Sequence, residues 1–276
     1  MPVLALPGRG ATAAYRRLAV AGFRRQWQYK LALFAGMFTN SVFGLLRGAV
    51  MLAAVGSAGS FGGYDAAGIG AYVWLSQALL GAVLFTDSGA ELGERVRSGD
   101  IAVDFLRPVD LQLATLAGDL GRATCTLLPR GLPTLAVGAL VYGGLELPGT
   151  PLTYLLGLVS VLLGTAISSL TLFATALVGF WVVETRGIRT LHQVLGSFLA
   201  GLFVPVHLFP GWLGAIAAAT PFPSVLQAPV DVLSGRVTGA AALAVLGVQV
   251  CWLLVMVALG QALLAAGRRK LEVQGG

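Results

Sequence analysis

Charged residues are scarce in this chain of 276 residues: only 11% are charged, whereas 57% are hydrophobic. Soluble domains usually hold about 25% charged and about 45–50% apolar residues, because their surfaces face water. A disordered chain would need more charge and fewer aromatic residues. The composition therefore excludes both classes and predicts a membrane protein.

Metal-binding side chains are equally rare. The two cysteines both fall within apolar runs, so they predict neither a disulfide framework nor a cysteine-rich metal site. His192 and His207 belong to no His-Glu-x-x-His motif. Asp100 and Asp104 form a single pair, whereas a magnesium diphosphate usually needs repeated aspartate clusters. We therefore expect no metal or cofactor in this chain.

The motifs of energy coupling are also missing. A phosphate-binding loop needs glycine before its lysine, but Lys30 follows Tyr29 and Lys270 follows Arg269. The apolar runs hold none of the 12 acidic residues, which disfavours a secondary, ion-coupled transporter. An intramembrane lipid-modifying enzyme would need a reactive cluster that the sequence does not display. Both classes stay open as alternatives to a permease that depends on another subunit for ATP.

Apolar runs dominate the rest of the chain. A helix needs about 20 apolar residues to cross about 30 Å of hydrocarbon. Six runs qualify, at residues 31–55, 69–86, 123–144, 152–182, 191–209 and 239–266. Backbone polar groups in lipid must be satisfied internally, so we expect helices. The prediction is one all-α polytopic domain, residues 1–276, with six transmembrane helices.

The basic residues orient this bundle. Segments 1–30, 87–122, 183–190 and 267–276 hold fifteen of the 18 Lys and Arg residues, and the alternate connections hold only Arg236. Short loops rich in Lys and Arg stay on the cytoplasmic side. We therefore expect a multi-pass protein of the inner (plasma) membrane with both termini cytoplasmic. The net charge of +6 then reflects topology and anionic lipid headgroups, with no nucleic-acid partner.

Two segments beside the crossings have an amphipathic character. Residues 12–30 predict a cytoplasmic interfacial helix on the membrane surface, the alternative being a flexible basic tail. In the cytoplasmic segment 87–122, acidic and basic residues alternate with apolar ones. A short helix from Glu91 should end at Ser98-Gly99, and Pro108 should break a second one. This segment suits a protein partner, although an interfacial connector that touches only lipid headgroups is the competing interpretation.

Three further features lie within or beside the crossings. Arg47 and Arg130 are charged residues inside apolar runs, so each should face protein or extend toward an interface, pairing with Glu146 or Asp65 and with Asp87 or Glu184 respectively. Residues 210–238 are too apolar for an aqueous loop and too rich in proline for a crossing, which favours outer re-entrant helices over a surface-lying segment. Small or hydroxyl residues share one face of the fourth run, where they indicate close helix packing or, alternatively, a substrate pathway. This stripe comprises Gly157, Ser160, Gly164, Ser168, Thr171 and Thr175.

The run Gly-Asp-Ile-Ala-Val-Asp-Phe-Leu-Arg-Pro at residues 99–108 resembles the signature of ABC-2-type permeases, the membrane subunits of ATP-binding cassette exporters. The stretch 201–213, with the prolines that follow it, is similar to the fifth span and outer re-entrant helices of that family. The resemblance implies a permease without an ATPase site of its own. Its partners would be a nucleotide-binding subunit that carries ATP and Mg and a second permease copy or a related permease. The cargo would be an amphiphilic small molecule, antibiotic or lipid.

The resemblance also assigns roles to residues. Segment 87–122 would hold the coupling helix, whose predicted contacts with the ATPase are Leu92, Glu94, Arg95, Val96, Arg97, Gly99, Asp100, Phe105, Arg107 and Pro108, with Leu92, Val96 and Phe105 as apolar anchors. The outer gate would comprise Pro205, His207, Phe209, Pro210, Pro221, Phe222 and Pro229. His207 departs from the family pattern, in which an apolar or hydroxyl residue is more usual.

Overall fold

The computed structural model describes residues 9–60, 62–83, 88–142, 144–145 and 149–274. This part of the chain is helical and contains no strand. The helices are α1 (Arg9–Gln28), α2 (Lys30–Ala58), α3 (Ala66–Leu79), α4 (Ser88–Ser98), α5 (Ile101–Phe105), α6 (Leu111–Thr126), η1 (Leu127–Gly131), α7 (Leu132–Tyr142), α8 (Pro151–Leu177), η2 (Val178–Phe180), α9 (Arg186–Leu199), η3 (Val206–Leu208), α10 (Gly211–Ala218), η4 (Phe222–Ser224), α11 (Gln227–Leu233) and α12 (Gly239–Gln274).

Side-chain caps mark where several helices begin. The carboxylate of Asp65 accepts a hydrogen bond from the backbone of Gly68 at the start of α3, and Asp110 caps α6 in the same way. Thr150 caps α8, and Pro151 occupies the first turn, where no backbone donor is needed. The local sequence therefore specifies where these three helices begin.

Four helical segments are long and apolar enough to cross a membrane: Lys30–Gly56, Leu111–Tyr142, Pro151–Phe180 and Gly239–Lys270. They correspond to the first, third, fourth and sixth predicted crossings, so these four are confirmed as helices of crossing length. The third begins at Leu111, earlier than the boundary near residue 123 that the apolar run indicated. Its first part therefore belongs to a long helix rather than to a connecting segment.

The second and fifth predicted crossings differ from expectation. α3 and α9 have 14 residues each, which corresponds to about 21 Å of helix against about 30 Å of hydrocarbon. In segment 210–238, α10 and the stretch Phe222–Leu233 form a pair bent by 74°, which is either a broken span or a re-entrant loop. By length and composition the described residues thus contain four crossings, or five if this pair counts as one.

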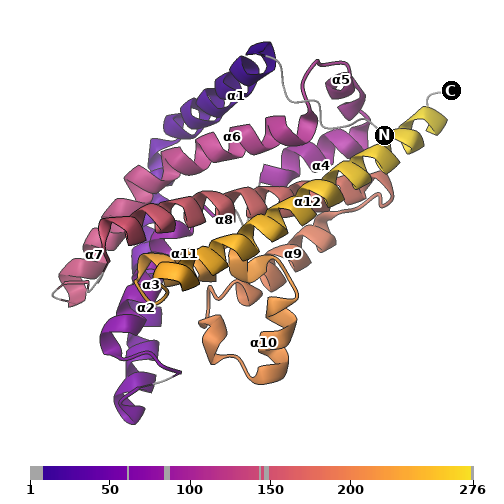
Figure 1. Cartoon of the computed structure of the whole chain (residues 1–276). Coiled ribbons are helices and arrows are strands. Elements are labelled where there is room, and N and C mark those ends of the chain that lie inside the picture. The colour runs from indigo at the N-terminus through magenta and orange to yellow at the C-terminus, as the bar shows by residue number, and fades with distance from the viewer. Residues whose placement is uncertain (1–8, 61, 84–87, 143, 146–148, 275–276) are drawn as a thin grey trace.

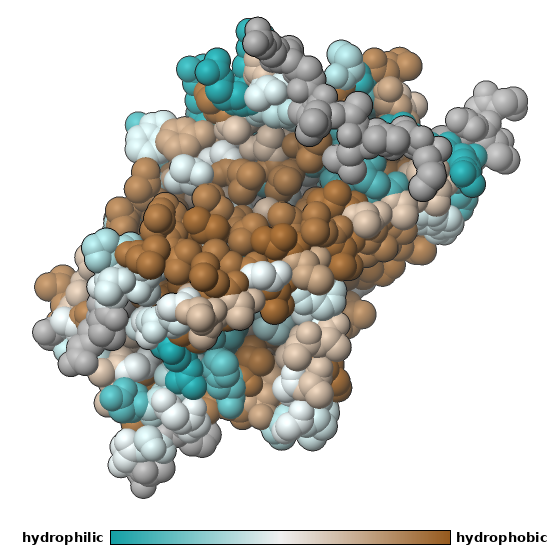
Figure 2. Space-filling model, in the orientation of Figure 1, coloured by the Kyte–Doolittle hydropathy of each residue, from teal (hydrophilic) through white to brown (hydrophobic). Residues whose placement is uncertain are grey.

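The core lies around α3 and α8. Every residue from Ile69 to Leu79 is buried, and so is most of α8. Figure 1 shows α8 and α12 running side by side through the molecule, with α1 beside α6 at one margin and α10 in a lobe at the other. Figure 2 shows a broad apolar band across the visible face, with hydrophilic side chains at its margins. Such a continuous exposed apolar surface is typical of a protein that faces lipid or another subunit.

Candidate functional site

Two short helices and a tight turn precede α6. α4 carries two arginines in its last turn, where positive charge is favourable beside the carbonyl end of a helix. Gly99 follows with a φ of 84°, the left-handed conformation that ends many helices. α5 starts after Asp100 and ends at Phe105, before Pro108. The predicted helix, its stop at Ser98-Gly99 and the break before the proline are confirmed. Residues 88–108 are called the α4–α5 element below.

A buried carboxylate holds the α4–α5 element together. The side chain of Asp104 is only 2% exposed, and its Oδ2 lies 2.5 Å from Nη2 of Arg95 on α4. Its Oδ1 lies 3.4 Å from Nη1 of Arg107, whose side chain is 61% exposed. Both arginines were predicted to contact the ATPase. Both also pair with Asp104, so in the structure they stabilise the turn between α4 and α5.

The apolar face of the α4–α5 element points into the protein. Leu92 and Val96 are 7% and 4% exposed, and they join Ile101 in one core cluster with residues of α8, η2 and α12. The other buried members are Phe173, Ala176, Leu177, Phe180 and Leu264. This placement corrects the prediction that Leu92 and Val96 are anchors for a partner, since an amphipathic helix that packs its apolar stripe on its own chain cannot offer it elsewhere. The third predicted anchor, Phe105, is partly buried beneath the guanidinium of Arg268, 4.3 Å from the ring centroid.

The opposite face of the element is exposed and mixed in character. Arg97 donates two hydrogen bonds to the carboxylate of Glu94, and this interaction lowers the pKa of Glu94. Asp100 accepts a hydrogen bond of 2.7 Å from Ser98. Gly99 and Pro108 lie in the turns that bound α5. Charged groups of both signs are thus accessible along one edge.

Two exposed apolar residues on this face escaped the sequence analysis. Val103 is 56% exposed and Leu106 is 84% exposed. They lie three residues apart, so they share one side of α5, whereas Ile101 and Asp104 are buried on the other. The sequence signal for them is the alternation of buried and exposed positions along α5. That alternation can be assigned only once Ile101 is known to face the core. Val103 and Leu106 are therefore large apolar side chains that the α4–α5 element exposes.

α1 is docked on α6 by direct backbone contact. A Cβ atom added at Gly22 would lie well under 3.0 Å from the carbonyl oxygen of Gly118, and one at Gly121 equally close to that of Ala19. Such approach requires glycine, as in close helix pairs in membranes. The predicted helix is therefore present, but its apolar side covers α6, and residues 111–122 of the expected cytoplasmic connection lie in that same helix pair.

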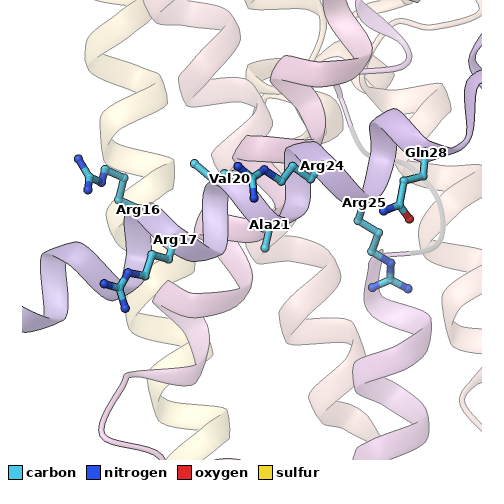
Figure 3. A pocket seen from close by; sticks show the side chains of 7 residues that line it. All are labelled: Arg16, Arg17, Val20, Ala21, Arg24, Arg25 and Gln28. Carbon is cyan, nitrogen blue, oxygen red and sulfur yellow. The ribbon is translucent and has the colours of Figure 1, made fainter.

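The outer side of α1 is strongly basic. Figure 3 shows Arg16, Arg17, Arg24 and Arg25 projecting from α1, with Val20, Ala21 and Gln28 between or beside them around a shallow surface hollow. Arg25 also reaches Glu91 on α4 at 3.0 Å, although both side chains are exposed. α1 therefore connects the α4–α5 element to a surface that suits anionic headgroups.

A buried polar network joins α3 to residues 201–231. Tyr72 on α3 contacts the Oε1 atom of Gln227 at 2.8 Å and the carbonyl oxygen of Gly201 at 2.7 Å. The amide of Gln227 donates to Asp231, whose other oxygen lies 2.8 Å from Nε2 of His207. Each buried polar group thus has a partner, as a stable interior requires. His207, which departed from the family pattern, is tied to a carboxylate.

The remaining predicted gate residues surround this network. Pro205 precedes η3, and Phe209 stacks on Phe198 with centroids 5.2 Å apart. Pro210 precedes α10, while Pro221 precedes η4. Phe222 stands edge-on to His192 of α9, and Pro229 is buried beside Gly164 of α8. These residues lie in or beside η3, α10, η4 and α11; of these pieces, α11 packs on α3 and α8, and η4 packs on α8 and α9.

The small-residue stripe of α8 packs mostly against other helices. A Cβ atom at Gly157 would meet Leu233, and one at Gly164 would lie 2.6 Å from the carbonyl oxygen of Val225. Ser160 donates to Gln249 of α12 at 2.8 Å. Farther along, Ser168 is buried, and the hydroxyls of Thr171 and Thr175 donate to carbonyls of their own helix. Gly157, Ser160 and Gly164 therefore serve the packing alternative.

Arg47 and Arg130 both face protein, but the partners differ from those expected. Arg47 donates to the hydroxyl of Ser76 at 3.2 Å, and Arg130 to the side-chain oxygen of Asn40 at 2.8 Å. Of the carboxylates expected to pair with them, Glu146 and Asp87 lie outside the described residues. A carboxylate also lies where none was expected: Asp119 sits within α6 and accepts a hydrogen bond from Ser169. The premise that no acidic residue lies in a crossing is therefore wrong.

No group of three His, Cys, Asp or Glu side chains that could hold a metal occurs in the described ranges. In a comparison with known families, a model described as "ABC-2 family transporter protein" matches residues 41–275. No curated protein and no solved structure matches the chain significantly.

Proposed function

Since the chain belongs to the ABC-2 family of transporter proteins, we propose that it is the permease through which a separate ATP-binding subunit drives export. Membership makes it a multi-pass membrane permease of an ABC transporter. In the proposed scheme the ATP-binding subunit, with ATP and Mg, docks on the exposed face of the α4–α5 element. A second permease copy or a related chain completes the conduit, as the broad apolar surface suggests.

The observation that carries the proposal is the two-sided construction of the α4–α5 element. One side is embedded through Leu92, Val96 and Ile101 in the core formed by α8 and α12. The other side exposes Val103 and Leu106 next to charged groups. Apolar anchors beside charged groups are what a protein interface usually requires. A displacement of this face is therefore transmitted through packed side chains to α8 and α12, as in a rigid-body movement.

We also propose six crossings with both termini cytoplasmic. α3 and α9 would be the second and fifth crossings, each completed by the non-helical residues that follow it, and the bent pair α10 with Phe222–Leu233 would be re-entrant. The distribution of basic residues supports this orientation. Irregular backbone at membrane depth is tolerated where it is buried in protein, and Ala200 and Leu202 after α9 are both buried.

The docking proposal is tested by reversing the character of the exposed anchors. The tagged chain is purified from its own membranes with the ATP-binding subunit, which is identified by mass spectrometry and by its phosphate-binding loop. Leu106→Asp should abolish co-purification and stimulated ATP hydrolysis, whereas the matched Leu106→Met should retain both. Because Leu106 is 84% exposed, neither variant should alter thermal unfolding. Unchanged co-purification and ATP hydrolysis with Leu106→Asp would refute this docking face.

A further inference from the structure

A cavity of about 710 Å³ opens between α2, the end of α3, the α6–η1 helix and α9. Its lining includes three arginines, Arg47, Arg122 and Arg130, and no aspartate or glutamate among the residues described there. The three arginines belong to helices that have crossing length. Arg122 forms an ion pair with Asp119 at 3.9 Å, so Arg47 and Arg130 are the two charges that need an explanation. Charged side chains in a membrane protein are costly unless they are paired or functional.

Among the residues that the structure describes, the hydrogen-bond partners of Arg47 and Arg130 are all neutral. Arg130 donates to Asn40, and Arg47 donates to Ser76 and, at 3.4 Å, to the carbonyl oxygen of Phe203. The Nε atoms of Arg47 and Arg130 are buried and have no hydrogen-bond partner among the described residues. Buried donors and charges normally find a partner of opposite character. A guanidinium carries five N–H donors, and the Nη groups of Arg47 and Arg130 have more of them than these bonds use, so donors remain for an anion that enters the cavity.

The fold makes specific room for Arg130. This residue lies in η1, a π-helical turn that contains Pro129 and belongs to the third helix of crossing length. π-turns inside helices occur frequently at functional sites. Its guanidinium lies between two glycines: a Cβ atom at Gly36 would be 2.7 Å from Cζ, and one at Gly81 would be 2.9 Å from Cδ. Glycine at both positions allows the charged group to reach the cavity.

The rim of the cavity is apolar and open. Phe43, Leu46 and Val50 follow one side of α2 around Arg47, and they are 54%, 59% and 65% exposed. Phe203 adds a fourth apolar side chain that is 51% exposed. A molecule that enters here would place one end among guanidinium groups and the other along an apolar surface that faces lipid or a second subunit.

We infer that this cavity binds an amphiphile with an anionic headgroup, a phosphate or carboxylate, whose apolar tail lies along α2. Guanidinium groups bind such anions through charge-assisted hydrogen bonds, often two at a time. The inference names the cargo class of the proposed permease and rests on that proposed function for its biological meaning. The headgroup could belong to a resident membrane lipid or to the exported molecule, and both share this chemistry.

The test measures binding to the purified full chain in a neutral detergent, without the ATP-binding subunit. The probes are palmitoyl lysophosphatidic acid and palmitoyl lysophosphatidylcholine, which share a tail and differ in net headgroup charge. We expect the anionic probe to bind about tenfold tighter or more, given the usual strength of hydrogen bonds to charged groups. Arg47→Gln and Arg130→Gln should each remove most of that preference, and Arg130→Lys should retain part of it.

Arg236→Gln is the matched control, because Arg236 is bonded to Gly63 outside the cavity. Equal affinity for the two probes, or a preference that survives Arg47→Gln and Arg130→Gln in folded protein, would overturn the inference. So would an equal loss with Arg236→Gln, or inorganic phosphate that binds as tightly as lysophosphatidic acid. Native mass spectrometry distinguishes the sources: a phospholipid retained by wild type and lost from Arg130→Gln supports a resident lipid, while an anionic non-lipid lost in the same way supports an exported molecule. If wild-type protein showed no preference for the anionic probe while the Leu106 variants behaved as expected, the cavity inference would fail and the docking proposal would stand.

Discussion

The contact between α1 and α6 allows a sharp test, because two glycines three residues apart in α6 differ only in what faces them. A methyl group at Gly121 would lie well under 3.0 Å from the carbonyl oxygen of Ala19, whereas one at Gly118 meets nothing within 4 Å. The obstructing atom belongs to the backbone, so no rotamer change relieves the clash. Gly121→Ala must therefore push the two helices apart by about 1 Å or more.

The effect of Gly121→Ala on the docking of α1 combines two opposing contributions to the free energy. Overpacking usually costs about 1–3 kcal/mol, whereas replacing glycine by alanine inside a helix stabilises it by about 1 kcal/mol. Gly118→Ala gains only the stabilisation from the higher helix propensity of alanine. The salt bridge between Arg25 and Glu91 joins side chains that are 71% and 64% exposed, so it compensates little. The two variants should differ by about 1–3 kcal/mol in the docking of α1, which is a factor of about 5–150.

Limited proteolysis measures this difference directly. α1 contains four arginines in its basic face, so trypsin cleaves it whenever the helix detaches and unfolds. When opening is fast, the cleavage rate tracks the population of the open form. Gly121→Ala should be cut in α1 at least about fivefold faster than Gly118→Ala under the same conditions. Equal rates for the two variants would show that the glycine contact does not hold α1 in place.

Three further outcomes are expected. Asp104→Ala should destabilise the protein by about 1–3 kcal/mol in thermal unfolding and weaken ATPase stimulation, because Arg95 loses a buried partner, while Glu94→Gln on the exposed face should leave the melting temperature nearly unchanged. Gln249→Leu should cost about 1–3 kcal/mol in the same assay, since it breaks the bonds to Ser160 and Ser224, and an unchanged melting temperature would contradict this reasoning. Gly36→Ala should lower the affinity for lysophosphatidic acid several-fold without unfolding the protein, because the added methyl displaces only the guanidinium of Arg130; unaltered affinity would argue against its role as a headgroup ligand.

Much of the α4–α5 element could be predicted from local sequence. Gly99 ends α4 because glycine tolerates a positive φ, and Pro108 follows the end of α5 because its ring disfavours helix before it. What local sequence does not contain is the partner of each face. The stripe of Leu92 and Val96 predicted an apolar contact correctly, but only the folded chain shows that the contact is with α8 and α12.

Some features of the crossing helices likewise follow from local sequence, and others depend on tertiary contacts. α2, α8 and α12 each contain a long, mainly apolar run, so hydropathy alone identified them as helices of crossing length. The third helix begins earlier than its apolar run because Gln112 and Asp119 find partners on α12 and α8, which satisfy polar groups that hydropathy counts as exposed. α3 is shorter than its apolar run, which continues past Leu79.

The sequence by itself determined the membrane environment, the long helices, the turn at Gly99 and the family, because composition, run length and short motifs are properties of neighbouring residues. The tertiary structure decided which side of the α4–α5 element is exposed, how α1 is held, and that Arg47 and Arg130 line one cavity. Arg130 and its partner Asn40 stand 90 positions apart in the chain. Contacts of that separation arise only when several helices pack at once, so no local pattern can specify them.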